Sequence, residues 1–209
     1  LRTRDGIRPA VPAYDRVVAV GDHTWRNVDL VVTFRVADVA RGRRVYGFPC
    51  YGRGIGFGSG WRGHTDWHDI YPRRGYLPAA NLLWLMCDGN GTEPFYLQSC
   101  AEATPLARLS QQDVPFSLGA WYRARLRFES QAPSSSSPGR ATLERPNRHR
   151  AKLWRARDPE PADWQLDAAG NPDEFDSGSF VIVAHNTVPV ISEIAVEATR
   201  TAGASPPAS

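Results

Sequence analysis

The side chains best suited to chemistry lie close together in one stretch, WRGHTDWHDIYPRRGY, between Trp61 and Tyr76. Its rings offer flat apolar faces, and its imidazole, carboxylate and guanidinium groups can bond hydroxyl groups. A saccharide site needs this combination of apolar platforms and a few placed polar groups. A long loop whose rings pack against the domain is the alternative, although connections of this length are usually functional. The side chains expected to contact a ligand are Trp61, Arg62, His64, Trp67, His68, Tyr71 and Tyr76.

Groups that can transfer protons stand in the same stretch. His64 or His68 could accept a proton while Asp66 or Asp69 serves as its partner, as in an enzyme that degrades glycans. Two histidines and a carboxylate could also hold a metal ion, but geometry rather than residue type decides such sites. The stretch is therefore compatible with binding alone, with catalysis and with a metal centre.

Directly before this stretch, the sequence GRGIGFGSG places glycine at every second position from 52 to 60. A β-strand directs alternate residues to opposite faces, so one face of this segment is bare backbone. Glycine within a strand marks a place where another group approaches the backbone closely. That group is either a sugar ring, with Gly54, Gly56 and Gly58 as ligand contacts, or a bulky aromatic from a neighbouring strand. The opposite face is expected to carry Arg53, Ile55, Phe57, Ser59 and Trp61.

Oxygen-bearing side chains gather in a second region, DAAGNPDEFD, which covers 167–176. Calcium takes roughly six to eight oxygen ligands, which makes it the one cofactor to consider here. The region lacks the fixed ligand positions of an EF-hand, and an ordinary turn rich in Asp and Asn has the same composition. The candidate calcium ligands are Asp167, Asn171, Asp173 and Asp176.

Basic side chains alternate along one expected strand, which carries Arg123, Arg125 and Arg127 on a single face. Arg150 and Lys152 would lie beside them if their two strands pair across the serine-rich loop. A basic ladder lining a groove would suit an anionic polysaccharide through bidentate guanidinium–carboxylate contacts. The ordinary explanation is a solvated face, because charged residues occupy the water side of half-buried strands.

The elements that must position these groups are β-strands. Apolar and polar residues alternate with the period of a half-buried strand, and helical periodicity longer than two turns is absent. The run DGNGTEP after residue 87 signals a tight hairpin turn. This pattern predicts an all-β fold, an antiparallel two-sheet β-sandwich of the jelly-roll type. Strands are expected over 28–36, 52–61, 81–87, 95–99, 121–129, 149–155, 178–184 and 190–196.

Length and composition define the class of protein. The 209 residues are 42% hydrophobic and 11% aromatic, which supplies one sizeable core and argues against intrinsic disorder. A net charge of +3 is too small to imply nucleic acid as a partner. No uncharged apolar run reaches the roughly 20 residues of a membrane-spanning helix. We expect an irregular N-terminal arm over 1–12, one jelly-roll domain over 13–199 and a Pro/Ala/Ser-rich tail or linker over 200–209.

Basic composition and cysteine content suggest where the protein acts. Lys152 is the one lysine among 25 basic residues, which is typical of a GC-rich bacterial genome. The chain starts without Met and is interpreted as a mature fragment, secreted or displayed at the cell surface. Export would allow one disulfide. Cys87 and Cys100 are the preferred pair over Cys50, because a short hairpin separates them.

Five segments carry a family resemblance: GDHTWRNVDLVVTFRV, GIGFGSGWRGHT, GAWYRARLRFE, HRAKLWRARDPEPADWQL and GSFVIVAHNTVPVISEIAVEA, which together span 21–198. They resemble the concanavalin A-like lectin/glucanase jelly rolls, and within these the secreted bacterial LamG-like domains of 3-keto-disaccharide hydrolase type. The resemblance implies a sugar-facing concave sheet, in some members with calcium. The paired-acid E-x-D-x-x-E motif of family 16 glycoside hydrolases is absent. Ser192-Glu193 stands where relatives often carry Asp-Asn, so a calcium ligand of the family is not matched.

Three hypotheses about function follow. The preferred one is an exported, lectin-like domain that binds a poly- or oligosaccharide through the glycine-rich strand and the polar-aromatic stretch. The second is a glycoside hydrolase or polysaccharide lyase on the same fold, since this architecture hosts both binding and catalysis. The third is a structural or adhesion module of a larger surface protein.

Overall fold

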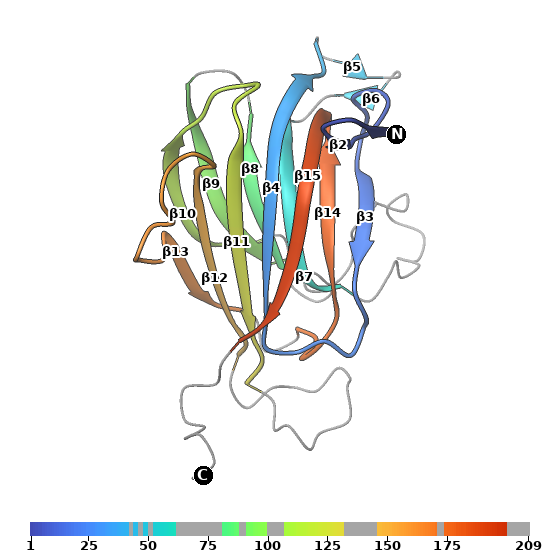
Figure 1. Ribbon diagram of the computed structural model, residues 1–209. Coiled ribbons are helices and arrows are strands. Elements are labelled where there is room, and N and C mark those ends of the chain that lie inside the picture. Colours follow the sequence, from blue (N-terminus) through green and yellow to red (C-terminus); the bar gives the residue numbers. More distant parts are fainter. Residues whose placement is uncertain are drawn as a thin grey trace.

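The chain folds into two stacked β-sheets (Figure 1). The computed structural model describes residues 1–41, 44–45, 48–49, 52–61, 81–87, 91–99, 107–131, 146–170 and 174–199. Within these ranges every regular element is a β-strand, and none is a helix. The described residues therefore hold no helix long and apolar enough to cross a membrane.

The first sheet has seven strands, which lie in the order β1-β2-β15-β4-β11-β12-β13. Its centre is formed by two 12-residue strands, β4 and β15, which pair antiparallel along their whole length. Its members are β1 (Arg2–Thr3), β2 (Gly6–Ile7), β4 (Val28–Val39), β11 (Tyr122–Glu129), β12 (Arg148–Arg155), β13 (Leu166–Ala169) and β15 (Thr187–Ala198).

The second sheet has six strands, which lie in the order β10-β9-β8-β7-β14-β3. All of its strand pairs are antiparallel. A separate two-stranded sheet consists of β5 (Arg44–Val45) and β6 (Phe48–Pro49). The members of the six-stranded sheet are β3 (Arg16–Val20), β7 (Gly54–Trp61), β8 (Asn81–Met86), β9 (Thr92–Ser99), β10 (Ala107–Pro115) and β14 (Ser179–His185).

The expected fold class, an antiparallel two-sheet β-sandwich, is confirmed. The eight expected strands are all present, as β4, β7, β8, β9, β11, β12, β14 and β15. β10 and β13 were not expected, because the polar sequence of β10 hides its alternation and β13 lies in the region interpreted as a turn. The arm over 1–12 also contains two short strands, β1 and β2, rather than being irregular throughout.

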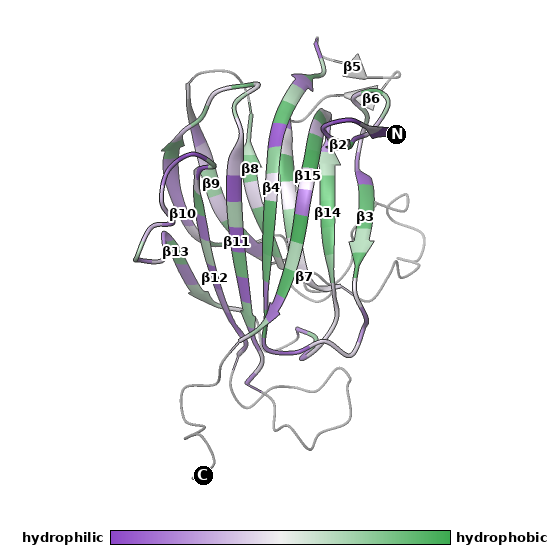
Figure 2. Ribbon diagram, in the orientation of Figure 1, coloured by the Kyte–Doolittle hydropathy of each residue, from purple (hydrophilic) through white to green (hydrophobic). Residues whose placement is uncertain are grey.

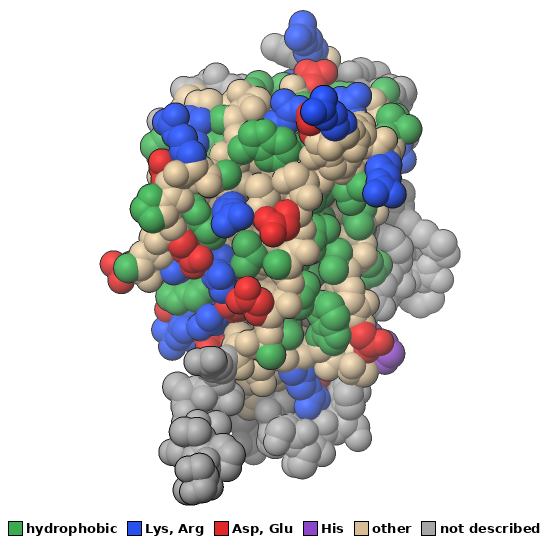
Figure 3. Space-filling view, in the orientation of Figure 1, with side chains coloured by type: hydrophobic (Ala, Val, Ile, Leu, Met, Phe, Trp, Pro, Cys, Tyr) green, Lys and Arg blue, Asp and Glu red, His purple; other side chains and the backbone are tan. Residues whose placement is uncertain are grey.

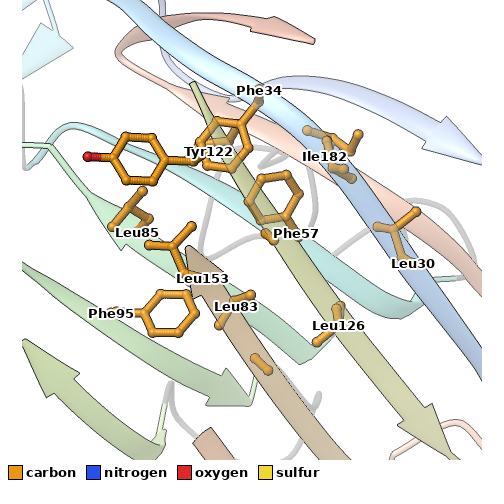
Figure 4. Close-up of a cluster of buried hydrophobic side chains, with 14 of the residues drawn as sticks. Leu30, Phe34, Phe57, Leu83, Leu85, Phe95, Tyr122, Leu126, Leu153 and Ile182 are labelled. Atoms are coloured by element: carbon orange, nitrogen blue, oxygen red, sulfur yellow. The ribbon is translucent and has the colours of Figure 1, made fainter. Parts of the chain in front are cut away.

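The core lies between the two sheets, where their inward side chains interdigitate (Figure 4). Phe34 of the seven-stranded sheet packs against Phe57 of the six-stranded sheet, with ring centroids 5.2 Å apart. Tyr122 and Leu126 of β11 point into the same space and are almost fully buried. Period-two alternation produces this layer, because every second residue of a strand faces the opposite sheet.

The central strands of the six-stranded sheet pack apolar side chains on both of their faces. In β14, Phe180 and Ile182 face the core, while Val181 and Val183 face away and are nevertheless fully buried. Figure 2 shows β14 as hydrophobic along its length, whereas hydrophilic residues interrupt β11. A strand buried on both faces reads as a continuous apolar run, and this explains why its sequence does not alternate.

Cys87 differs from the expectation. Its side chain belongs to the core cluster, and its thiol donates a hydrogen bond to the carbonyl oxygen of Leu85, 3.6 Å away. Cys87 is therefore a buried thiol here rather than half of the preferred disulfide. The alternation along β8 explains this, because Leu83, Leu85 and Cys87 all point inward. Cys50 and Cys100, like the tail over 200–209, lie outside the described residues.

Candidate functional site

The glycine row of β7 lies on the outer face of the six-stranded sheet, which we define as the face turned away from the seven-stranded sheet. One cross-strand row on this face contains Tyr96, Trp84, Gly56 and Val183, which pair as direct neighbours. These residues belong to a second apolar cluster, separate from the core. Its buried members are Leu82, Trp84, Tyr96, Val181 and Val183, with Val17, Trp61 and Met86 packed against them.

The expected open floor of bare backbone is not observed. A Cβ added to Gly56 would lie 3.0 to 3.2 Å from ring atoms of Trp84, and one added to Gly54 would lie 3.3 Å from the sulfur of Met86. Gly58 is buried as well. Of the two explanations for the glycine row, a bulky aromatic from the neighbouring strand is therefore the one found at Gly56. The glycines let that ring lie against the backbone.

A bulge at Gly60 changes the face on which Trp61 lies. The pairing of β7 with β14 shifts register between Ser179 and Val181, and Gly60 adopts a φ of +72°. Simple alternation would place Trp61 on the core side with Phe57, but it packs against the outer-face cluster instead. An extra residue with positive φ reverses the alternation, and glycine tolerates that conformation best.

A histidine–aspartate pair lies beside this aromatic cluster. Nδ1 of His185 is 2.6 Å from a carboxylate oxygen of Asp15, whose side chain is only 2% exposed. The His185 ring also makes edge contacts with Tyr14 and Trp84, at centroid distances of 5.0 and 5.9 Å. Sequence reasoning missed this group, because Asp15 and His185 are 170 positions apart. The apolar run of β8 was the available signal for Trp84.

The polar-aromatic stretch itself lies almost entirely outside the described residues. The strands on either side of the connection that contains it are described, because Trp61 ends β7 and Asn81 begins the adjacent strand β8. These strands pair with Ser59 opposite Asn81, so Trp61 and Asn81, which precede and follow the connection, lie at the same end of the six-stranded sheet. The predicted site residues outside the described part are Arg62, His64, Asp66, Trp67, His68, Asp69, Tyr71 and Tyr76.

The structure separates the two described calcium candidates. Asp167 accepts two hydrogen bonds of 2.7 Å from Arg148 on the seven-stranded sheet. Asp176 is buried and accepts hydrogen bonds from Arg26 and from the hydroxyl of Ser177. Each carboxylate thus has an arginine as its partner, and the described residues contain no group of metal-binding side chains. Asn171 and Asp173 lie outside the described residues.

The basic ladder on the seven-stranded sheet forms as expected, with Arg125 opposite Lys152 and Arg127 opposite Arg150. Carboxylates neutralise it. Asp29 accepts hydrogen bonds of 2.8 Å from both Arg125 and Arg127, and these bonds raise the pKa of Arg127. Figure 3 shows Lys/Arg and Asp/Glu side chains intermixed over this face. The ladder is therefore an ion-pair network rather than a surplus of positive charge.

A polar cluster inside the sandwich was not foreseen. Nε2 of His149 lies 2.8 Å from Glu174, and its Nδ1 lies 3.4 Å from the hydroxyl of Ser59. Nε2 can donate a hydrogen bond to the carboxylate, and Nδ1 is within hydrogen-bond distance of the hydroxyl. Asn147 also donates to Glu174, at 3.3 Å. Ser, His and Glu are in the order of a hydrolytic triad, but each is at most 4% exposed, so substrate has no access.

Comparison with known proteins identifies the fold. No family model and no curated protein sequence matches the chain. Among solved structures, the carbohydrate-binding module CBM66 from Bacillus subtilis is similar, with a TM-score of 0.51 and 13% identity over 94% of this chain and 89% of that one. A legume lectin-like domain from Entamoeba histolytica has a TM-score of 0.55 and 8% identity over 96% and 87%. The chain has a jelly-roll fold of the lectin type.

The contact between Gly56 and Trp84 predicts sensitivity to any side chain at this position. We expect Gly56→Val to lower the free energy of unfolding by about 1–3 kcal/mol, because the new methyl groups must displace a buried ring. Ala19→Val, an exposed position of β3 in the same sheet, is the matched control and should change it little. Equal stability of the two variants in urea unfolding would contradict the packing explanation.

The interior cluster predicts that Glu174 is structural. Glu174→Ala leaves the His149 N–H buried without its acceptor, so we expect a loss of about 2–3 kcal/mol of unfolding free energy. Glu197→Ala removes an exposed carboxylate 3.5 Å from Arg125 and should stay within about 0.5 kcal/mol of wild type. Chemical denaturation of both variants tests this, and similar losses would show that burial of the cluster is not the cause.

The pairing of Asp167 predicts a dependence of stability on pH. Hydrogen bonds from Arg148 lower the pKa of Asp167 below its ordinary value of 3.8. A carboxyl with a lowered folded-state pKa stabilises the fold above its unfolded pKa, and this contribution is lost as pH falls through the folded-state pKa. The stability difference between wild type and Asp167→Asn should therefore shrink in acid. Thermal unfolding from pH 7 to 2 measures it, with Asp163→Asn, which replaces an exposed aspartate, as the control.

Proposed function

We propose that the chain is a carbohydrate-binding jelly-roll domain whose site is the polar-aromatic stretch over 61–76 at the end of β7. Two similar structures are a carbohydrate-binding module and a lectin-like domain. The stretch contains the stacking rings and hydroxyl-bonding groups that a saccharide requires. A site on a connection anchored by two paired strands also agrees with the usual place of binding residues on rigid scaffolds.

The observation that carries this proposal is the position of Trp61. The Gly60 bulge brings this half-buried ring to the outer face, directly before the rest of the stretch. Trp84 and Tyr96 are 4% and 8% exposed, so in this proposal they pack behind Trp61 rather than contact the sugar. Gly54 and Gly56 are covered and are not ligand contacts in this proposal.

The charge distribution favours a neutral glycan over an anionic one at this site. The one basic feature that suggested an anionic polysaccharide, the ladder of β11 and β12, lies on the other sheet and is paired with carboxylates. Recognition then depends on ring stacking and on hydrogen bonds to hydroxyl groups. Such a site binds with little dependence on salt, because screening weakens only charged contacts.

The proposal predicts that binding depends on the rings of the stretch. On affinity gels containing neutral polysaccharides, the wild type should be retarded, and Trp61→Ala and Trp67→Ala should each weaken retardation about tenfold, since stacked rings carry much of the contact area. Trp121→Ala is the matched control, because its ring lies against Arg35 on the seven-stranded sheet. Its retardation should equal that of the wild type.

Two results would overturn the proposal. One is a folded protein that no polysaccharide retards. The other is turnover of a glycan that disappears in a His64→Ala/His68→Ala double variant, which would make the chain an enzyme rather than a binding domain. Circular dichroism of each variant separates lost binding from lost folding.

A further inference from the structure

A groove opens along the edge of the sandwich, on the side of the N-terminus. Its volume is about 550 Å³, which falls within the range of roughly 300–1,000 Å³ typical of small-molecule sites. It lies between β3 and β14 of one sheet and β2 and β15 of the other. Its floor is apolar and belongs to the core, since Ile182, Ala184 and Ile191 are each at most 6% exposed.

The walls of the groove hold most of the exposed large hydrophobic side chains of the described residues. Leu1, Ile7, Val11 and Val18 line it and are 70%, 39%, 43% and 43% exposed. Exposed apolar side chains that occur singly are ordinary, but several around one concave site mark a place where an apolar group binds. The groove therefore has the lining that a hydrocarbon chain requires.

Three arginines stand around this apolar groove, namely Arg2, Arg8 and Arg16. All three are exposed, and within the described part of the chain none of their side chains has a carboxylate partner. Among the described residues that line the groove, none has an acidic side chain. They contrast with Arg125 and Arg127 of the basic ladder, whose charge Asp29 offsets. Figure 3 shows Lys/Arg and hydrophobic side chains together near the N-terminus.

We propose that this groove binds an anionic amphiphile with one hydrocarbon chain, such as a fatty acid. The chain would lie on Ile182 and Ile191, and the carboxylate would lie among the arginines, which suit bidentate contacts. A second copy of this protein fits less well, because its own groove would bring three more arginines against these. The site is independent of the proposed glycan site, since it lies at the edge strand β3 rather than at the junction of β7 and β8.

The test is calorimetric titration with sodium dodecanoate below its micellar concentration. Wild type should bind it, and Arg8→Gln/Arg16→Gln should weaken binding about tenfold or more. Val18→Asp should abolish binding, because a carboxylate would then stand on the groove wall. Leu118→Asp is the matched control, since Leu118 is also 43% exposed but does not line the groove. Dodecyltrimethylammonium, which has the same chain and the opposite charge, should bind at least tenfold more weakly than dodecanoate.

Several outcomes would overturn this inference. They are absence of dodecanoate binding, equal binding of the two amphiphiles, or the same loss in Leu118→Asp as in Val18→Asp. A wild-type dimer in light scattering that Val18→Asp converts to a monomer, without dodecanoate binding, would assign the groove to a second copy instead. Retardation on polysaccharide gels should be unchanged in all groove variants that keep the wild-type circular dichroism spectrum, so the two proposals fail separately.

Discussion

The structure depends on one constraint, which is that the central strands of the six-stranded sheet bury apolar side chains on both of their faces. Val181 and Val183 point away from the core and are as fully buried as Phe180 and Ile182, which point into it. Large side chains can pack on the outer face only where the backbone leaves room. The glycines of β7 supply that room, and Trp84 occupies it at Gly56. The aromatic cluster behind the proposed site is a consequence of this packing.

Most of the fold could be predicted because it rests on local pattern. Alternation along β4 and β11 located both strands, and the apolar run of β8 located a third. The prediction was wrong or incomplete where local pattern is weak or interrupted. The polar sequence of β10 hides its alternation. In β7, glycine alternates regularly with other residues in the sequence, but the Gly60 bulge moves Trp61 to the opposite face of the sheet. The periodicity of the sequence does not reveal a one-residue bulge, but the bulge decides which side chains are in contact.

The candidate site was predicted less completely, because its geometry comes from contacts distant in sequence. His185 meets Asp15 across 170 positions, and Ser59 meets His149 across 90. Residue type alone could not name Asp15 as the partner of His185. The same limit applies to the calcium candidates, since Asp167 and Asp176 are nine positions apart yet bond to Arg148 and Arg26 in separate environments. Spacing shows which side chains are neighbours along the chain, whereas the sheet register decides which are neighbours in space.

Charge gives the clearest case of this difference. The basic ladder is the most conspicuous charged pattern of the sequence, yet Asp29, which sits on β4 and is 2% exposed, binds two of its arginines. The arginines of the N-terminal arm form no pattern, yet Arg2 and Arg8 stand around an apolar groove whose described lining contains no carboxylate. A guanidinium whose charge is already offset by a buried carboxylate attracts a second anion less strongly, although some of its N–H donors remain available. In this structure, an arginine without a carboxylate partner among the described residues is therefore a better candidate for binding an anion than a dense row of arginines whose charges are offset.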